Sequence, residues 1–154
     1  MSTPLQCNYA DIYNDFLLTR HNIQEAIAAY HNLESELAEL EQTGMYPSVP
    51  SEQWQTRNGS GEYLYMLFHT DRDGNYQGPD GKRKIYVGNK PERIEEARRL
   101  AANRVLYEQK RRSYDRLREW IHAVNYQARY LKQKADGWRD IVDPGSAGRL
   151  INIM

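Results

Sequence analysis

The chain has 154 residues, about the length of one domain, so a second full domain is not expected. Hydrophobic residues make up 40% of it and charged residues 27%, and the mean hydropathy is −0.89, which favours long amphipathic helices over a thick core. The single cysteine, Cys7, excludes an intramolecular disulfide and is too few for a thiolate metal site. No apolar run is long enough to cross a bilayer, and the N-terminal residues lack the pattern of a signal peptide. We therefore expect a cytoplasmic protein with no membrane partner.

The net charge is zero, but the charges are unevenly divided along the chain. Residues 1–81 carry 3 basic and 12 acidic side chains, whereas residues 82–139 carry 17 basic and 7 acidic ones. Such asymmetry has two explanations, which are compatible with each other. An acidic helix can pair with a basic helix of the same chain, or the basic segment can form a surface for nucleic acid.

The first predicted element is a long helix within residues 1–44. No proline or glycine interrupts the chain from Tyr9 to Glu41, and Thr43-Gly44 is a plausible stop. Two heptad seams run along this stretch, and nine of their ten positions are apolar or aromatic, which is typical of a coiled coil. The seams are Tyr9, Phe16, Ile23, Tyr30, Leu37 and Ile12, Thr19, Ala26, Leu33, Leu40. Four glutamates near the helix end, where the helix dipole favours cations, predict a basic neighbour: Glu34, Glu36, Glu39 and Glu41.

Residues 45–90 are predicted to form a connector and a β-hairpin. The segment up to Gly61 has no helical periodicity and is expected to hold at most a short strand around Trp54. Residues 63–69 and 83–87 are rich in aromatic and branched side chains and are separated by turn formers, which indicates an antiparallel hairpin with a long loop. Alternation places Leu64, Met66, Phe68, Ile85 and Val87 on one face and Tyr63, Tyr65, His69, Lys84 and Tyr86 on the other.

A second long helix is predicted for residues 91–139. Pro91 suits a first helical turn, and the next breaker is Gly137. One heptad seam of this helix is Leu100, Tyr107, Tyr114, Ile121, Ala128, Ala135, and a second one in the latter half is Leu117, Val124, Leu131, Trp138. In the first half, Ile94, Ala97 and Ala101 shift the apolar stripe, so that half is expected to pack on the hairpin. Residues 140–154 form a tail that ends in a short apolar stretch from Leu150 to Met154.

Together these elements predict a mainly α chain with a small β-hairpin, of class α+β. Two long antiparallel coiled-coil helices would flank a two- to three-stranded antiparallel sheet within one structural domain. The exposed seams and the apolar tail leave more apolar surface than two helices can bury, so a homo-oligomer is expected.

No catalytic or cofactor motif stands out. The four histidines lack metal-ligand spacing, and no phosphate loop or recognisable nucleophile setting occurs. Asp71-Arg72-Asp73-Gly74-Asn75 is similar to the start of a calcium loop, but Tyr76 and Lys82 occupy the positions that need glycine and glutamate. We expect turn chemistry there, no metal site, no cofactor and no enzymatic activity.

Two basic constellations suggest nucleic-acid binding instead. Tyr63, Tyr65, Lys84 and Tyr86 on one strand face, with Lys82, Arg83 and Lys90 nearby, combine rings for base stacking with cations for phosphate. Cross-strand tyrosines are also ordinary stabilisers of a small sheet. In the second helix, eight arginine and lysine side chains form a basic cluster: Arg98, Arg99, Arg104, Lys110, Arg111, Arg112, Arg116 and Arg118. They can contact a nucleic-acid backbone or pair with the acidic helix.

The middle of the chain also resembles a known family. The runs GEYLYMLF at 61–68, GPDGKRKIYVG at 78–88 and PERIEEA at 91–97 resemble the arm-type DNA-binding module of phage and plasmid tyrosine recombinases, and similar small mobile-element proteins. The resemblance covers residues 61–105. It implies that a small sheet enters the major groove, with contact roles for Tyr65, Lys82, Arg83, Lys84 and Tyr86. No recombinase catalytic domain follows, so recombination is not implied.

The sequence therefore predicts a non-enzymatic nucleic-acid-binding or regulatory protein, with DNA as the favoured ligand. Its predicted contact residues are Tyr65, Lys82, Arg83, Lys84, Tyr86, Lys90, Arg111 and Arg112. The alternative is a coiled-coil protein that binds a protein partner, as an inhibitor, adaptor or structural component of phage or mobile-element origin.

Overall fold

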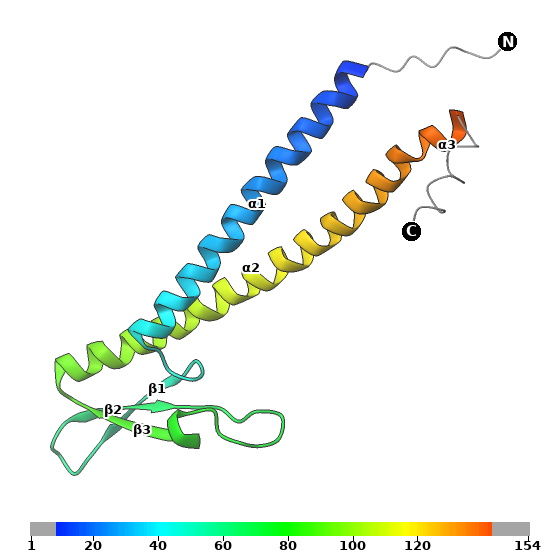
Figure 1. The fold of residues 1–154 in the computed structure, drawn as a ribbon. Coiled ribbons are helices and arrows are strands. Elements are labelled where there is room, and N and C mark those ends of the chain that lie inside the picture. The colour runs from blue at the N-terminus through cyan, green and yellow to red at the C-terminus, as the bar shows by residue number, and fades with distance from the viewer. Residues whose placement is uncertain (1–8, 143–154) are drawn as a thin grey trace. The chain divides into compact units, whose positions relative to one another are not determined.

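The computed structural model describes residues 9–142 and contains two long helices and a three-stranded sheet (Figure 1). The elements are α1 (Tyr9–Thr43), β1 (Ser51–Thr56), β2 (Glu62–Leu67), a short 3-10 turn (Pro79–Gly81), β3 (Lys84–Gly88), α2 (Pro91–Asp136) and α3 (Trp138–Val142). The predicted α+β class is confirmed. The apolar tail from Leu150 to Met154 lies outside the described residues.

The chain divides into two compact units, and both long helices run through each of them. Residues 29–114 form what we call the sheet unit. The described residues 9–28 and 115–142 form what we call the helical unit. Within residues 9–142, no helix is both long enough and apolar enough to span a membrane.

The helix ends follow the sequence signals closely. Gly44 adopts a φ of +90°, which side chains rarely tolerate, and its N–H bonds the Leu40 carbonyl at 3.1 Å, closing α1 one residue after Thr43. Helix α2 begins at Pro91 as predicted. It ends at Asp136, before Gly137, and α3 then carries the helical region to Val142.

The sheet is antiparallel in the order β1-β2-β3, so β1 is a full partner of β2. The sequence predicts at most a short strand around Trp54, but all six residues of β1 are paired. The turn between β1 and β2 places Asn58 at φ 38° and Gly59 at φ 74°, the positive angles that a tight hairpin turn requires. The Asn-Gly pair is the feature that allows this additional strand.

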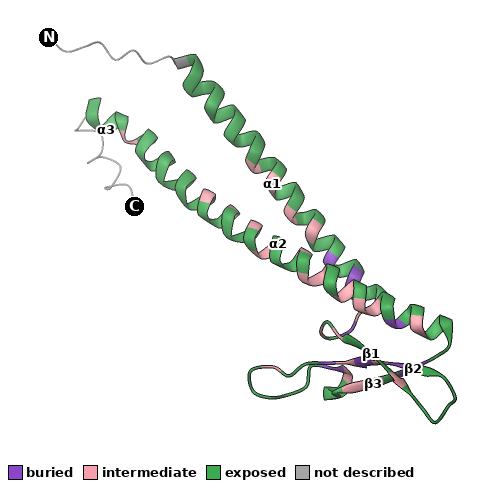
Figure 2. Ribbon diagram, turned by 180° about the vertical axis from the view of Figure 1, so that it is seen from behind, coloured by how far each residue is buried: buried purple, intermediate pink, exposed green. Residues whose placement is uncertain are grey.

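The main core lies between one face of the sheet and the start of α2. Leu64 and Met66 on β2 are fully buried, together with Phe68, Val87 and Ala97. Ile94, Leu100 and Ala101 pack against this cluster, which confirms that the first part of α2 covers the hairpin. Tyr46 closes the core with an edge-on contact to Phe68, and burial, followed by the nearby Glu96 carboxylate, raises the pKa of its hydroxyl. Figure 2 shows the buried residues gathered at the sheet and at the adjoining parts of the helices.

In the sheet unit, α1 and α2 contact each other in antiparallel order. The Tyr30 and Tyr114 rings stack at 4.6 Å, and their hydroxyls lie 2.6 Å apart. Nearer the sheet, Lys110 Nζ lies 2.6 Å from a Glu36 carboxylate oxygen. The predicted basic neighbour of the acidic end of α1 is therefore present. Leu37 and Leu40 are buried here, whereas the seam residue Phe16 in the helical unit is 60% exposed.

An ion pair links β1 to α2, and its contribution to the free energy of unfolding depends on pH. Arg98 donates two hydrogen bonds to Glu52, at 2.7 and 3.1 Å, and they lower the pKa of the Glu52 carboxyl against the opposing effect of its partial burial. Because the carboxyl has a lower pKa in the folded state than in the unfolded state, its ionised form stabilises the fold at pH values above the unfolded-state pKa. This contribution to stability is lost as the pH falls through the folded-state pKa.

We expect Glu52→Gln to lower the thermal unfolding midpoint slightly at about pH 7, because the pair is largely solvated. At an acidic pH below the lowered pKa of Glu52, where the carboxyl is protonated in both states, the variant and the wild type should melt alike. Thermal melts at the two pH values measure this. A difference that persists unchanged at the acidic pH would show that the pair does not stabilise the fold through charge.

Candidate nucleic-acid interface

The face of the sheet that points away from α2 carries tyrosine, lysine and glutamine side chains. Strand register places Gln53, Tyr65 and Tyr86 side by side across the three strands, and Gln55 beside Tyr63. Because side chains alternate along a strand, Lys84 is on the same face as Tyr86. We call this set the outer face: Gln53, Gln55, Tyr63, Tyr65, Lys84 and Tyr86. The predicted division of the hairpin into an apolar and an aromatic-basic face is confirmed.

The three tyrosine rings form one continuous aromatic surface. The Tyr65 and Tyr86 centroids are 5.2 Å apart with the rings tilted by 60°, and the Tyr63 and Tyr86 centroids are 6.1 Å apart at 35°. Tyr86 is 49% exposed, whereas Tyr63 and Tyr65 are half-buried. Lys84 Nζ lies 3.8 Å from the centroid of Tyr65, in a cation–π contact. The cation is thereby held beside the rings.

Hydrogen bonds fix the surroundings of these rings. The Tyr63 hydroxyl donates to the Ser60 carbonyl at 3.2 Å, which holds its ring against the hairpin turn. The Gln55 amide donates to Gln53 Oε1 at 3.2 Å, so the two amides on β1 are aligned with each other. At the other end of the face, His69 Nε2 lies 3.2 Å from Ser51 Oγ. These hydrogen bonds tie the outer face to the adjoining turn and strand ends.

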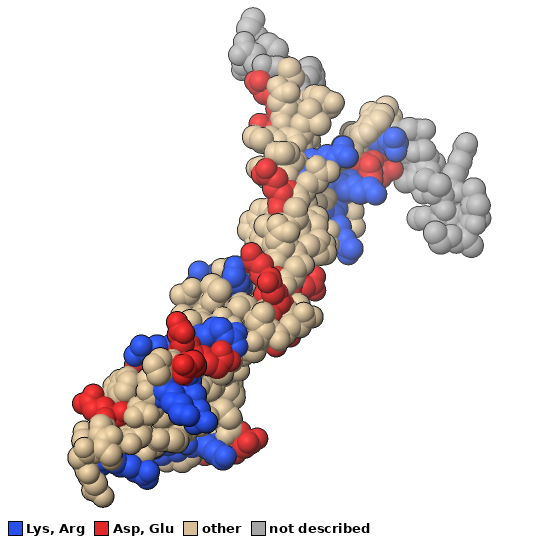
Figure 3. Space-filling view, turned by 90° about the vertical axis from the view of Figure 1, so that its left-hand side faces the viewer, with Lys and Arg blue, Asp and Glu red and all other residues tan. Residues whose placement is uncertain are grey.

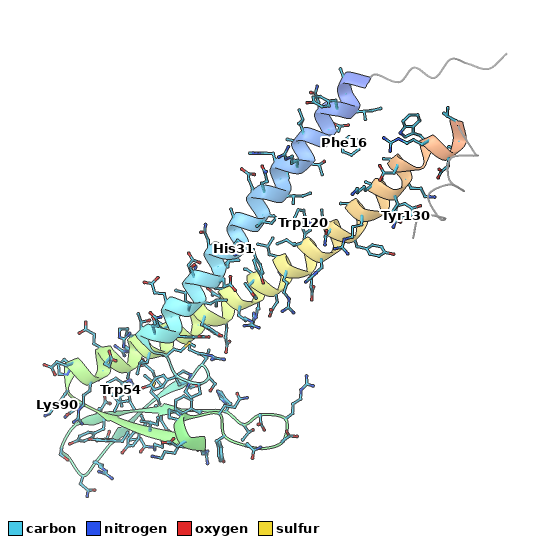
Figure 4. The ribbon with its side chains drawn as sticks, in the orientation of Figure 1. Phe16, His31, Trp54, Lys90, Trp120 and Tyr130 are labelled. Carbon is cyan, nitrogen blue, oxygen red and sulfur yellow. The ribbon has the colours of Figure 1, made fainter. Side chains whose placement is uncertain are left out.

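The other predicted contact residues of the hairpin lie apart from the rings. Lys82 is exposed just after the 3-10 turn. The Arg83 guanidinium lies 5.8 Å from the Tyr76 ring, so this side chain is directed to the loop between β2 and β3. Lys90 is exposed at the entry to α2 (Figure 4). Of the residues predicted on the hairpin, the structure brings together Tyr65, Lys84 and Tyr86.

Half of the basic cluster on α2 is already paired with carboxylates. Ion pairs of 2.6 to 3.1 Å join Arg98 to Glu52, Arg99 to Glu96, Arg104 to Glu108 and Lys110 to Glu36. Basic and acidic side chains accordingly lie next to each other on the surface seen in Figure 3. Arg111 and Arg112 lie on the exposed surface of α2, and the Arg111 guanidinium is 5.4 Å from the Tyr114 ring. Of these four pairs, Lys110–Glu36 joins α2 to the acidic end of α1, as the intramolecular explanation expects, whereas two pairs lie within α2 and one reaches β1.

The acidic segment after β2 forms a turn, as predicted. Asp71 Oδ1 accepts hydrogen bonds from the N–H groups of Asp73 and Asn75, both at 2.9 Å. This carboxylate oxygen therefore organises its own loop. Among residues 9–142 there is no group of three or more histidine, cysteine or acidic side chains placed to hold a metal ion.

Gln53 and Gln55 are outer-face residues that the sequence pattern did not predict. Both lie on β1, whose extent was underestimated, and the Asn58-Gly59 turn was the signal that could have placed them. Their amides add donors and acceptors beside the rings, the chemistry that reads base edges. The outer face can therefore stack, hydrogen-bond and neutralise charge within one ordered surface. Comparisons with protein-family models, with curated proteins and with solved structures gave no match to this chain.

Proposed function

We propose that the protein is a non-enzymatic nucleic-acid-binding protein and that its outer face is the contact surface. One observation carries the proposal: three tyrosine rings and the Lys84 ammonium meet on a single accessible sheet face. Packing in the hydrophobic core does not explain this arrangement, because that core lies on the opposite face of the same strands.

The chemistry of the outer face suits a nucleic acid in three ways. Aromatic rings stack on bases, and each stacked base contributes about 1–3 kcal/mol. The amides of Gln53 and Gln55 can bond base edges, since glutamine pairs well with adenine. Lys84 supplies positive charge for phosphate. The resemblance of residues 61–105 to the arm-type module favours DNA over RNA as the ligand.

The remaining predicted contacts extend the surface. Lys82 and Lys90 are exposed near the two ends of β3 and can contact the backbone on either side of the stacked bases. Arg111 and Arg112 are exposed on α2 within the same unit. We assign to these four residues a supporting electrostatic role, which strengthens binding without selecting sequence.

Salt dependence tests the role of Lys84. We expect Lys84→Gln to weaken binding of a fluorescent oligonucleotide and to reduce the slope of log affinity against log salt by about 0.7–0.9, because one phosphate contact is lost. Fluorescence anisotropy at several salt concentrations measures both quantities. The matched variant Arg112→Gln should change the slope no more than Lys84→Gln does. A slope that changes for Arg112→Gln alone would place the contact on α2 and refute the assignment to the outer face.

A second candidate function is protein association through the helices. It is favoured by an apolar groove in the helical unit, lined by residues of both long helices that include Phe16, Ile23 and Leu131. The groove and the outer face share no residues, so protein association through the helices is compatible with nucleic-acid binding by the outer face. We propose it as the basis of self-association or partner binding.

A further inference from the structure

The helical unit lacks a core of its own. Every buried residue among those that the structure describes belongs to residues 29–114, the sheet unit. In contrast, most of the exposed large apolar side chains within residues 9–142 belong to the helical unit. Helices gain most of their stability in proteins from packing an apolar face. The two helical segments therefore need a further surface to cover them.

The uncovered surface is a groove between the two helical segments. It has a volume of about 350 Å³ and runs past Phe16 and Ile23 on α1 and Ala128, Leu131 and Ala135 on α2. All five are positions of the heptad seams predicted from the sequence. Phe16 is 60% exposed and Leu131 is 54% exposed. Figure 4 shows Phe16 on the side of α1 that faces α2.

A second apolar depression continues the first. Ile23 and Ala128 line both, and Ile27, Trp120 and Val124 extend the surface toward the middle of the helices. Ile27 and Trp120 flank the seams rather than forming part of them. An apolar stripe that includes flanking positions is wider than a two-helix seam needs and is typical of helices in a four-helix bundle.

We propose that a second copy of this chain covers the groove, so that the helical units of two copies form a four-helix bundle. This names the partner for the helix-mediated association proposed above and rests on that function. Two identical grooves related by a twofold axis bury each other, which is the commonest way in which proteins form oligomers. Neither copy needs a residue of the outer face for this contact.

The charges of the helical unit favour a second copy as the occupant. Residues 9–28 carry three acidic side chains and one basic one, whereas residues 115–142 carry six basic and four acidic ones. In a twofold bundle, the acidic α1 segment of one copy can lie beside the basic α2 segment of the other. The two segments together are neutral, so two copies do not repel each other.

The oligomeric mass tests the proposal. At tens of micromolar, the full chain should have twice the mass of the 18.1-kDa protomer by light scattering. Phe16→Glu combined with Leu131→Glu should give the mass of a single chain, because two charges would be buried in each half of the interface. Both side chains are more than half exposed in the single chain, so these changes should leave the fold of one chain intact.

Tyr126→Glu is the matched control. Tyr126 is 77% exposed and lies two residues from both Val124 and Ala128, which puts it on the opposite side of α2 from the groove. This variant should remain dimeric. A single-chain mass for the wild type would overturn the proposal, because the groove would then have to be covered by something other than a second copy, such as another protein or residues 143–154. A dimer that survives Phe16→Glu with Leu131→Glu would also overturn it, since the interface would then lie elsewhere.

Nucleic-acid binding by the same variants separates this proposal from the function of the outer face. If the variant is a single chain and still binds an oligonucleotide, the bundle proposal is supported and the outer face binds without the bundle. A dimeric wild type that binds no nucleic acid would support the bundle and refute the outer-face function.

Discussion

Leu64→Ala is expected to lower the free energy of unfolding by about 2–5 kcal/mol. Leu64 has no exposed surface and stands at the centre of the cluster between the sheet and α2, so the lost methyl groups leave a cavity. Because small domains are stable by only about 5–15 kcal/mol, this loss removes a large part of the total. Urea unfolding followed by circular dichroism measures the change.

Leu67→Ala is the matched control for this substitution. Leu67 lies on the same strand but on the opposite face and is only half-buried, so its truncation should cost clearly less. Equal losses for Leu64→Ala and Leu67→Ala would contradict the assignment of the core to a single face of the sheet.

The second large effect concerns the tyrosines. Tyr65→Ala combined with Tyr86→Ala should weaken oligonucleotide binding by at least about 30-fold, because each stacking contact contributes about 1–3 kcal/mol. The slope of affinity against salt should stay unchanged, since the loss of rings releases no counterions. Anisotropy titrations at several salt concentrations measure both.

Phenylalanine substitutions control for the loss of the rings. Tyr65→Phe combined with Tyr86→Phe keeps both aromatic faces, so this variant should bind nearly as tightly as the wild type. Equal weakening by the alanine and phenylalanine pairs would show that the hydroxyls, rather than stacking, hold the ligand. The proposed stacking role would then be wrong.

The sequence predicted the helices well because their signals are local. Uninterrupted heptads predicted the extent of α1, and Gly44 and Pro91 marked boundaries that the structure confirms. The face of each hairpin strand followed from alternation, since a shift of one residue would expose Leu64 and Met66. Patterns with a fixed period are readable without knowledge of tertiary contacts.

Other features depend on contacts between distant residues and could not be read in this way. Arg98 looked like part of a basic surface, but it pairs with Glu52, 46 residues earlier in the chain. Arg83 was grouped with Lys84, yet the loop between β2 and β3 brings Tyr76 beneath its guanidinium. Such pairings follow from the folding of loops, which composition does not determine. The extent of β1 was underestimated for a different reason, because its Asn58-Gly59 turn was treated only as a breaker.

Direct titration of the wild-type protein tests the central proposal. Fluorescent double-stranded DNA, single-stranded DNA and single-stranded RNA are compared at low salt, where the electrostatic contribution to binding is strongest. We expect saturable binding to at least one of them, with DNA bound more tightly than RNA, and a loss of affinity when Tyr65 and Tyr86 are both replaced by alanine. No binding to any of the three at low salt, or binding that is indifferent to those two rings, would contradict a nucleic-acid function for the outer face.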